Sequence, residues 1–274
     1  MFEDDVILIK GAGDLASGVA LRLWRCGFKL VLTELQQPTA IRLSVAFAKA
    51  IFYGRTTVEE ATACRVNTIE EVFEQWQMNN IPVLVDPDAG IREGLSPKVI
   101  VDARIAKRNL GTTIDEAPLV IGLGPGFTAG EDVNAVIETN RGHYMGRVFW
   151  QGSAEPDSRV PGEVKGIRKD RVVYSPTDGV FHHSKSIGEL VRSGDKLGTV
   201  NGVAVIAGID GVLRGLIHDG VPVQKDLKIG DVDPRAMIDH CFSVSEKSLA
   251  VGGGVLEAIL SWMRTEAYIE TLSK

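Results

Sequence analysis

The chain has 274 residues, of which 44% are hydrophobic and 24% are charged, the proportions of an ordinary globular protein. Its net charge of −6 and the lack of a basic run argue against a nucleic-acid partner. No apolar stretch approaches the roughly 20 residues that span a bilayer, and the first residues do not read as a signal peptide. We therefore expect a cytoplasmic protein with no membrane partner, long enough for two domains.

The three cysteines, Cys26, Cys64 and Cys241, are few, odd in number and scattered. This usage fits a reducing compartment, and the spacing predicts neither a disulfide framework nor a metal site. Each is expected to be a small buried hydrophobe.

The first thirty-four residues predict a strand, a glycine turn, a helix and a second strand that ends on an acid. In this unit Gly11 would allow a tight bend, and Gly13 would let a pyrophosphate approach the main chain. The first N–H groups of the helix would then face an anion. Glu34 lies 21 residues after Gly13, where an acid would accept hydrogen bonds from a ribose.

Asp14 is the unusual residue of this turn, because a carboxylate should repel a phosphate. It has two interpretations. It is either the N-cap of the helix, a common position for Asp, or a member of the ligand site.

Up to about Trp150 the pattern alternates strands and helices, with buried strands over 81–85, 98–101 and 118–121 and a helix over 133–137. Such alternation predicts a parallel α/β sheet, which binds ligands at the carboxyl ends of its strands.

Further candidate ligand contacts follow two of these strands. Asp102, Arg104 and Lys107 would suit a second anion, or would form an exposed charged loop. Gly124 and Gly126 would contact a ligand, or would serve turns that need positive φ angles. The candidate cofactor-binding residues are therefore Gly11, Gly13, Asp14, Glu34, Asp102, Arg104, Lys107, Gly124 and Gly126. No residue is singled out as catalytic, and no metal site is expected.

Residues 178–200 and 210–232 match at a constant offset of 32 residues, which indicates an internal repeat. Short β-rich pieces separated by glycine turns resemble the barrel-sandwich fold of biotinyl and lipoyl carrier domains. The hairpin over 200–203 carries an Asn-Gly turn but no lysine, so a swinging arm is excluded. His182, His183 and His218 are expected to face solvent.

The predicted fold class is α/β, with three parts. Residues 1–152 form a Rossmann-like nucleotide- or cofactor-binding domain, 167–236 form the barrel-sandwich domain, and 237–274 form a glycine loop and a helix that packs back on the first domain. Residues 248–254 read as a strand followed by three glycines. The three glycines either form a third anion-binding site at the start of a helix or allow that helix start to pack closely.

Seven sequence segments, taken in their order along the chain, resemble those of a known family. They span 11–18, 33–42, 102–109, 120–130, 136–143, 230–235 and 250–260. Together they are similar to the YqeB-type proteins associated with selenium-dependent molybdenum hydroxylases. The resemblance implies an accessory or maturation role toward such a hydroxylase, which would be a partner.

The glycine turn and this resemblance lead to one hypothesis and two alternatives. The first is a maturation protein that binds a molybdopterin-type cofactor or a dinucleotide, that is, a small anionic nucleotide-like ligand. The second is an NAD-dependent oxidoreductase, in which Glu34 favours NAD over NADP. The third is a non-catalytic module that docks a hydroxylase subunit. Whether the chain is an enzyme or a homo-oligomer stays open, and only Cys64 and Cys241 are candidates for handling selenium.

Overall fold

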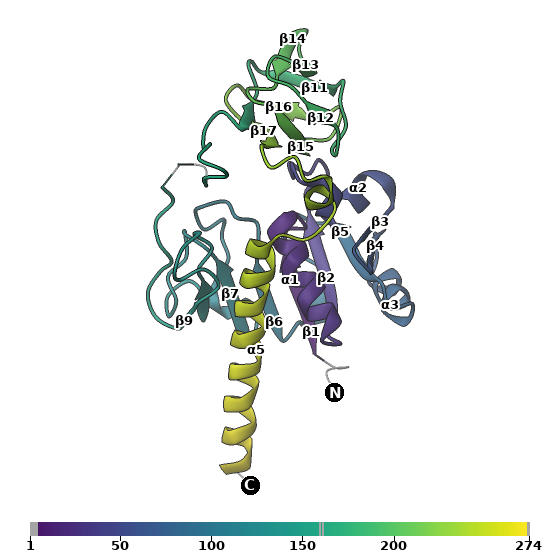
Figure 1. Ribbon diagram of the computed structural model, residues 1–274. Helices are drawn as coiled ribbons and strands as arrows, with labels where there is room; N and C mark the ends of the chain where they lie inside the picture. Colours follow the sequence, from purple (N-terminus) through teal and green to yellow (C-terminus); the bar gives the residue numbers. More distant parts are fainter. Residues whose placement is uncertain (1–4, 159, 161, 273–274) are drawn as a thin grey trace.

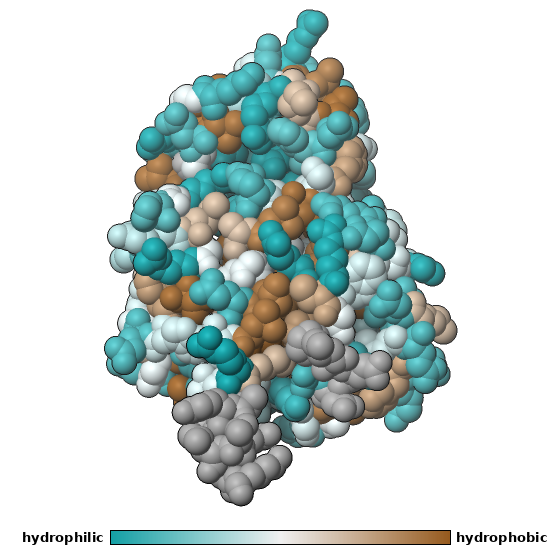
Figure 2. Space-filling view, turned by 60° about the horizontal axis from the view of Figure 1, so that its bottom comes forward, coloured by the Kyte–Doolittle hydropathy of each residue, from teal (hydrophilic) through white to brown (hydrophobic). Residues whose placement is uncertain are grey.

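The computed structural model describes residues 5–158, 160 and 162–272 (Figure 1). In this part of the chain a nine-stranded sheet carries the first half, and two four-stranded sheets form a separate β region above it. The face shown in Figure 2 mixes hydrophilic residues with small hydrophobic patches.

The large sheet has the strand order β3-β4-β5-β2-β1-β6-β7-β8-β9. The strands are β1 (Val6–Lys10), β2 (Lys29–Glu34), β3 (Arg55–Val58), β4 (Ala61–Val66), β5 (Ile81–Val85), β6 (Val99–Asp102), β7 (Leu119–Leu123), β8 (Ala135–Ile137) and β9 (Val148–Phe149). Strands β4 to β8 of this order pair in parallel, whereas β3 and β9 pair antiparallel at the two edges.

The helices cover both faces of this sheet. They are α1 (Asp14–Arg25), α2 (Lys49–Tyr53), α3 (Ile69–Gln77), α4 (Arg92–Leu95) and α5 (Glu246–Leu272), with short 3-10 turns η1 (Leu43–Val45), η2 (Ile114–Glu116) and η3 (Ile238–Cys241). Side chains alternate along β1, so Ile7 and Ile9 pack beneath α1 and α5 while Leu8 packs on the face that α3 covers. None of the helices in the described ranges is both long and apolar enough to cross a membrane.

The β region contains β10 (Val172–Tyr174), β11 (Gly179–His183), β12 (Leu190–Val191), β13 (Lys196–Val200), β14 (Val203–Ile206), β15 (Gly211–Leu216), β16 (Pro222–Val223) and β17 (Lys228–Asp233). Its two sheets have the orders β10-β17-β15-β12 and β14-β13-β11-β16. All pairings in them are antiparallel.

The 32-residue repeat maps strand onto strand: β11, β12 and β13 recur as β15, β16 and β17. The short strand of each copy pairs with the first strand of the other copy, since β12 joins β15 and β16 joins β11. The two copies therefore interlock, and their apolar residues form one common core.

The fold class expected from the sequence, a Rossmann-like parallel sheet with a biotinyl- or lipoyl-like barrel-sandwich domain, is wrong. The first sheet is mixed, because antiparallel strands close both edges, and the β region is a pair of antiparallel sheets. The helix expected over 133–137 is also wrong. Residues 135–137 form β8, where a short apolar, β-branched run pairs with β7. The domain boundaries stay a prediction.

The three glycines at 252–254 lie inside α5 instead of forming a loop. They let α5 pack very closely on its neighbours. A Cβ on Gly252 would lie 2.9 Å from the carbonyl oxygen of Gly18, and a Cβ on Gly18 would lie 2.5 Å from the Cβ of Ser248. The helix pair α1–α5 is therefore in near backbone contact (Figure 1).

Two adjacent glycines of α5 give a matched test of this packing. A Cβ on Gly254 would lie 2.2 Å from the carbonyl oxygen of Gly146, whereas a Cβ on Gly253 meets nothing within 4 Å. Gly253→Ala should stabilise the protein by about 0.5–1 kcal/mol through helix propensity. Gly254→Ala should destabilise it by about 1–2 kcal/mol, because overpacking costs about 1–3 kcal/mol. Thermal melting of both variants checks this, and shifts of the same sign would contradict it.

Candidate anion-binding site

The glycine turn after β1 is shaped by its neighbours. Gly11 has a φ of +98°, and a Cβ there would lie 3.1 Å from the carbonyl oxygen of Ala103. Its N–H donates to the Thr33 carbonyl at 2.7 Å. A glycine is required at this position for both the backbone angle and the approach of the loop after β6. At Gly13, by contrast, a Cβ would meet only the Cβ of Ala40, at an ordinary 3.9 Å.

Glu34 braces this turn from the end of β2. Its Oε2 accepts the N–H of Ala12 at 2.9 Å, and its Oε1 accepts the N–H of Leu35 at 2.8 Å. Burial raises the pKa of the Glu34 carboxyl, and the two backbone hydrogen bonds act in the opposite direction. Both oxygens are thus engaged by the main chain, and the contact of Glu34 with a ribose stays a prediction.

Asp14 connects three segments at the start of α1. The N-cap is Gly13, so the interpretation of Asp14 as the cap is wrong. The Asp14 carboxylate accepts hydrogen bonds from Arg42 Nη1 and from Ser248 Oγ, each at 2.9 Å. Its charge is therefore balanced by Arg42, which is only 8% exposed.

The charge of Arg42 acts on Arg214, which together with Arg235 lies beside Asp233, and we refer to these three arginines and Asp233 as the arginine cluster. Arg235 Nε and Nη2 donate to the Asp233 carboxylate at 2.9 and 2.6 Å, and Arg214 Nη1 lies 3.5 Å from it. Arg42 and Arg214 both donate to the carbonyl of His240. Among the described residues, no partner contacts the buried Nε of Arg42 or the buried Nδ1 of His240.

Lys228 and Lys247 stand beside this cluster, one at the start of β17 and one in the first turn of α5. Partial desolvation lowers the pKa of each ammonium, although Lys228 is exposed to solvent and Lys247 is half-buried. At Lys228 the charge of Asp231 raises the pKa, Arg171 and Lys107 lower it, and Asp14 raises it. At Lys247 the charge of Arg141 lowers the pKa, Asp14 and Glu138 raise it, and Lys107 lowers it.

These two lysines differ from the cations around them in forming no close ion pair, although the charge of Asp231 acts on Lys228 and that of Glu138 acts on Lys247. Lys107 pairs with Asp157 at 2.8 Å, Arg171 pairs with Asp231 and Arg141 pairs with Glu246. No ion pair of Lys228 or Lys247 is found within residues 5–158, 160 and 162–272. We refer to Lys228 and Lys247, together with the three cations that act on them, Lys107, Arg141 and Arg171, as the cation cleft; the charge of Asp14 acts on both lysines.

Asp102 and Arg104 form a second, inward-facing network. Asp102 is 2% exposed, and its carboxylate accepts from the Arg104 guanidinium and from Thr112 Oγ1. Lys10 Nζ donates to the same hydroxyl at 2.8 Å and pairs with Glu116. The charges of this network are satisfied by one another, which favours a structural role over contact with a second anion.

Gly124 and Gly126 allow loops to pack. Their φ angles are +75° and +110°. A Cβ would lie 2.4 Å from Thr139 Oγ1 at Gly124 and 2.6 Å from Arg108 Cα at Gly126. The positive φ angles, with the Thr139 side chain close to Gly124 and the Arg108 backbone close to Gly126, explain both glycines without a ligand.

The structure therefore separates the predicted residues into groups. Gly11, Gly13, Asp14 and Glu34 gather at the ends of β1 and β2; Asp102 and Arg104 lie behind them, and Gly124 and Gly126 lie after β7. Only Lys107 of the predicted cations joins the cation cleft. Sequence reasoning missed Arg42, Lys228 and Lys247. The repeat gave one indirect signal, because it predicts that Lys228 begins the last strand of the second copy.

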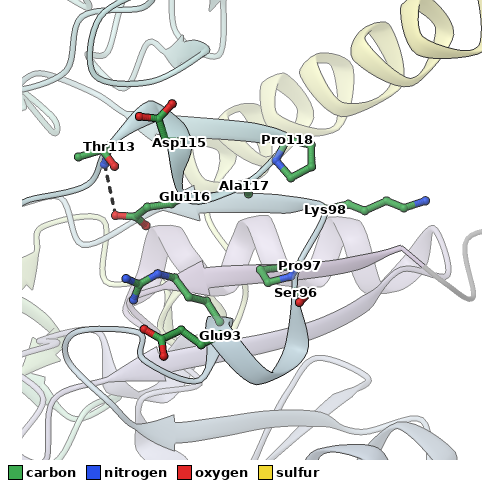
Figure 3. Close-up of a pocket in the computed structure, with 10 residues that line it drawn as sticks. Glu93, Ser96, Pro97, Lys98, Thr113, Asp115, Glu116, Ala117 and Pro118 are labelled. Carbon is green, nitrogen blue, oxygen red and sulfur yellow. Dashed lines mark hydrogen bonds between the residues drawn. The ribbon is translucent and has the colours of Figure 1, made fainter.

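A larger hollow lies away from the cation cleft. A pocket of about 770 Å³ opens near the starts of β6 and β7, between α4 and the segment that contains Thr113 and Glu116 (Figure 3). Its acidic and basic side chains are mixed. It lies at the amino ends of the strands, whereas ligands of such sheets bind at the carboxyl ends. No cluster of metal-ligating side chains is found among the described residues.

Comparison with known proteins gives one clear relative. No family model matches the sequence. The uncharacterized protein YqeB of Escherichia coli K12 is 46% identical over 258 residues, which cover 94% of this chain and 48% of YqeB. The chain thus spans about half the length of the curated relative that it matches.

Solved structures resemble the chain only loosely. A succinylglutamate desuccinylase/aspartoacylase from Rhodobacter sphaeroides is 15% identical with a TM-score of 0.27, covering 84% of this chain and 85% of that one. An aspartoacylase family protein from Mesorhizobium loti is 12% identical with a TM-score of 0.25, covering 85% of each chain. No residue role follows from similarity at this level.

These comparisons correct the expected function. The relative is uncharacterized, and the similar structures bear the names of desuccinylases and aspartoacylases. The prediction of a molybdenum hydroxylase maturation protein, with its molybdenum cofactor and selenium dependence, is therefore wrong. The alternatives of an NAD-dependent oxidoreductase and a hydroxylase-docking module match none of these names either. The match to YqeB shows what this chain is similar to: 258 residues align at 46% identity with about half of that protein.

Proposed function

We propose that the chain binds a small polyanion, a compound with two or more phosphate groups, in the cation cleft. The observation that carries this proposal is the convergence of Lys228 and Lys247. They come from the β region and from α5, form no ion pair with a described residue, and share Lys107 and Asp14 as charged neighbours, with Asp231 also acting on Lys228 and Glu138 on Lys247.

The location of the cleft supports an anionic ligand. It lies beside the start of α1, where main-chain N–H groups and the helix dipole favour negative charge. The turn is open at Gly13, since a side-chain carbon there would meet nothing closer than 3.9 Å. Arg42 and Ser248 neutralise and hold Asp14, so its carboxylate does not repel an incoming anion at full strength.

The charges in the cleft favour a ligand with more than one negative group. Partial desolvation, and then the like charges nearby, oppose the charged form of both lysines more than the neighbouring acids favour it. A phosphate group bound between the two ammonium groups would favour their charged form instead. Arg141 and Arg171 on the two sides already neutralise acids, so the ammonium groups supply the uncompensated charge. A polyanion that reaches both lysines would also link the β region to α5.

A double variant tests this proposal. Lys228→Met combined with Lys247→Met should weaken pyrophosphate binding by about tenfold or more, because one hydrogen bond to a charged group contributes about 1.5–3 kcal/mol. Titration calorimetry measures the affinity. Wild-type affinity should also fall as the pH rises, since both pKa values are lowered and the anion needs the charged ammonium.

The repeat offers a matched control. Lys196 occupies the position of Lys228 in the first copy and is likewise exposed, so Lys196→Met should leave pyrophosphate binding unchanged. Citrate, titrated in parallel, distinguishes phosphate from carboxylate recognition. Pyrophosphate binding of wild-type strength in the double variant would overturn the proposal.

The arginine cluster that borders the cleft predicts a pH dependence of stability. Burial alone would raise the pKa of Asp233, but hydrogen bonds and charge from Arg235, with the charge of Arg214, lower it from 3.8 to about 2. Because the folded-state pKa is lowered, the contribution is present above about pH 4 and is lost as the pH falls toward 2. The shift corresponds to about 2 kcal/mol.

Asp233→Asn removes this contribution. Its free energy of unfolding from urea melts should lie at least about 2 kcal/mol below wild type near pH 7, with a difference that shrinks as the pH falls from about 4 to 2. A difference that is constant with pH would show that the Asp233 carboxylate does not stabilise the folded chain through its charge.

A further inference from the structure

A second cavity lies between α2 and the β region, on the other side of the segments that form the arginine cluster. It has a volume of about 270 Å³. Its walls include Leu43, Lys49 and Tyr53 from the first half, Leu216 and His218 from the β region, and Phe242 after η3. We refer to it as the α2 pocket.

The walls of the α2 pocket combine apolar and aromatic side chains with polar and charged ones. Leu43, Leu216 and the neighbouring Ile217 are buried, whereas Tyr53 and Phe242 are 62% and 52% exposed. Two large aromatic side chains therefore stand at the cavity with much of their surface in water. A flat apolar group placed between them would remove that surface from water, which is favourable.

His218 and Tyr53 fix the polar atoms of one wall. The His218 ring stacks on Phe52 with a centroid distance of 3.8 Å and an angle of 3°. Its Nδ1 lies 2.6 Å from the carbonyl oxygen of Asp219, which can only accept, so Nδ1 carries the proton. In the neutral ring Nε2 then accepts from the Tyr53 hydroxyl at 3.1 Å. This pair is saturated, and it presents ring surface to the cavity rather than a free donor.

Lys49 supplies the uncompensated charge of the pocket. Its ammonium lies over the Tyr53 ring, 5.7 Å from the centroid, and no ion pair of it is found in the part of the chain that the structure describes. The other lysine of the wall, Lys185, pairs with Glu189 at 3.2 Å. The lowered pKa of Asp219, due first to the hydrogen bond from the His183 amide, keeps one negative charge on the opposite side.

We propose that the α2 pocket binds a small planar carboxylate, with the carboxylate on Lys49 and the flat apolar body between Tyr53 and Phe242. One uncompensated ammonium matches one negative group, and Asp219 disfavours a second. The volume lies just below the roughly 300–1,000 Å³ of ordinary ligand sites, so the ligand is no larger than one or two rings. This site goes beyond the cation cleft and takes a ligand of different chemistry.

Benzoate is a suitable probe, with benzamide as its uncharged isostere. Titration calorimetry or ligand-observed NMR on the full chain should show saturable benzoate binding and weaker benzamide binding. Lys49→Met should weaken benzoate binding by about tenfold, the effect of losing one charge-assisted contact, and should bring it to the level of benzamide. Lys49→Arg should restore most of the affinity.

Three controls keep the result specific. Lys225→Met removes an exposed lysine that does not line the pocket and should change nothing. Acetate, which has the charge but no ring, should bind more weakly than benzoate. The Lys228→Met/Lys247→Met variant should bind benzoate like wild type, so the failure of one site does not imply the failure of the other. Absence of saturable benzoate binding, or binding unaffected by Lys49→Met, overturns this proposal.

Discussion

The close contact of α1 with α5 is the constraint on which the rest of the molecule depends. Only glycine at positions 18 and 252 lets the two backbones approach this far. Because the helices touch there, Ser248 reaches Asp14 at 2.9 Å, and Lys247, one residue earlier, comes to the cation cleft. Residues more than two hundred positions apart thus meet beyond the carboxyl end of the central strand β1.

Buried charge joins the β region to this frame. Arg42 donates to Asp14 and to main-chain carbonyls around η3, and Leu216 N–H donates to the Ile41 carbonyl at 2.7 Å. Removing an acid from such a cluster leaves a buried cation without compensation, which is costly. Three segments contribute to both sites. Arg42, Arg214 and the carbonyl of His240 contact one another in the arginine cluster. The residues two positions later in each segment, Ser44, Leu216 and Phe242, line the α2 pocket.

Local sequence patterns were enough to predict several central strands of the large sheet. The strands over 81–85 and near 99–102 and 119–123 are confirmed, since short apolar runs ending at acids or glycines indicate buried strands. The helix at 252–254 was missed because each glycine weakens a helix by about 1 kcal/mol, and only packing against α1 explains it. Lys228 and Lys247 could not be paired from the sequence, because their meeting depends on the relative placement of the β region and α5.

The interlocked repeat carries a consequence for the origin of the β region. Each copy lends its short strand to the other, with β12 on β15 and β16 on β11. A lone copy would expose an unfilled sheet edge and half a core. Before the duplication, such a unit would have had to exchange strands with an identical molecule, so the present single chain has the pairing of a symmetric dimer fused end to end.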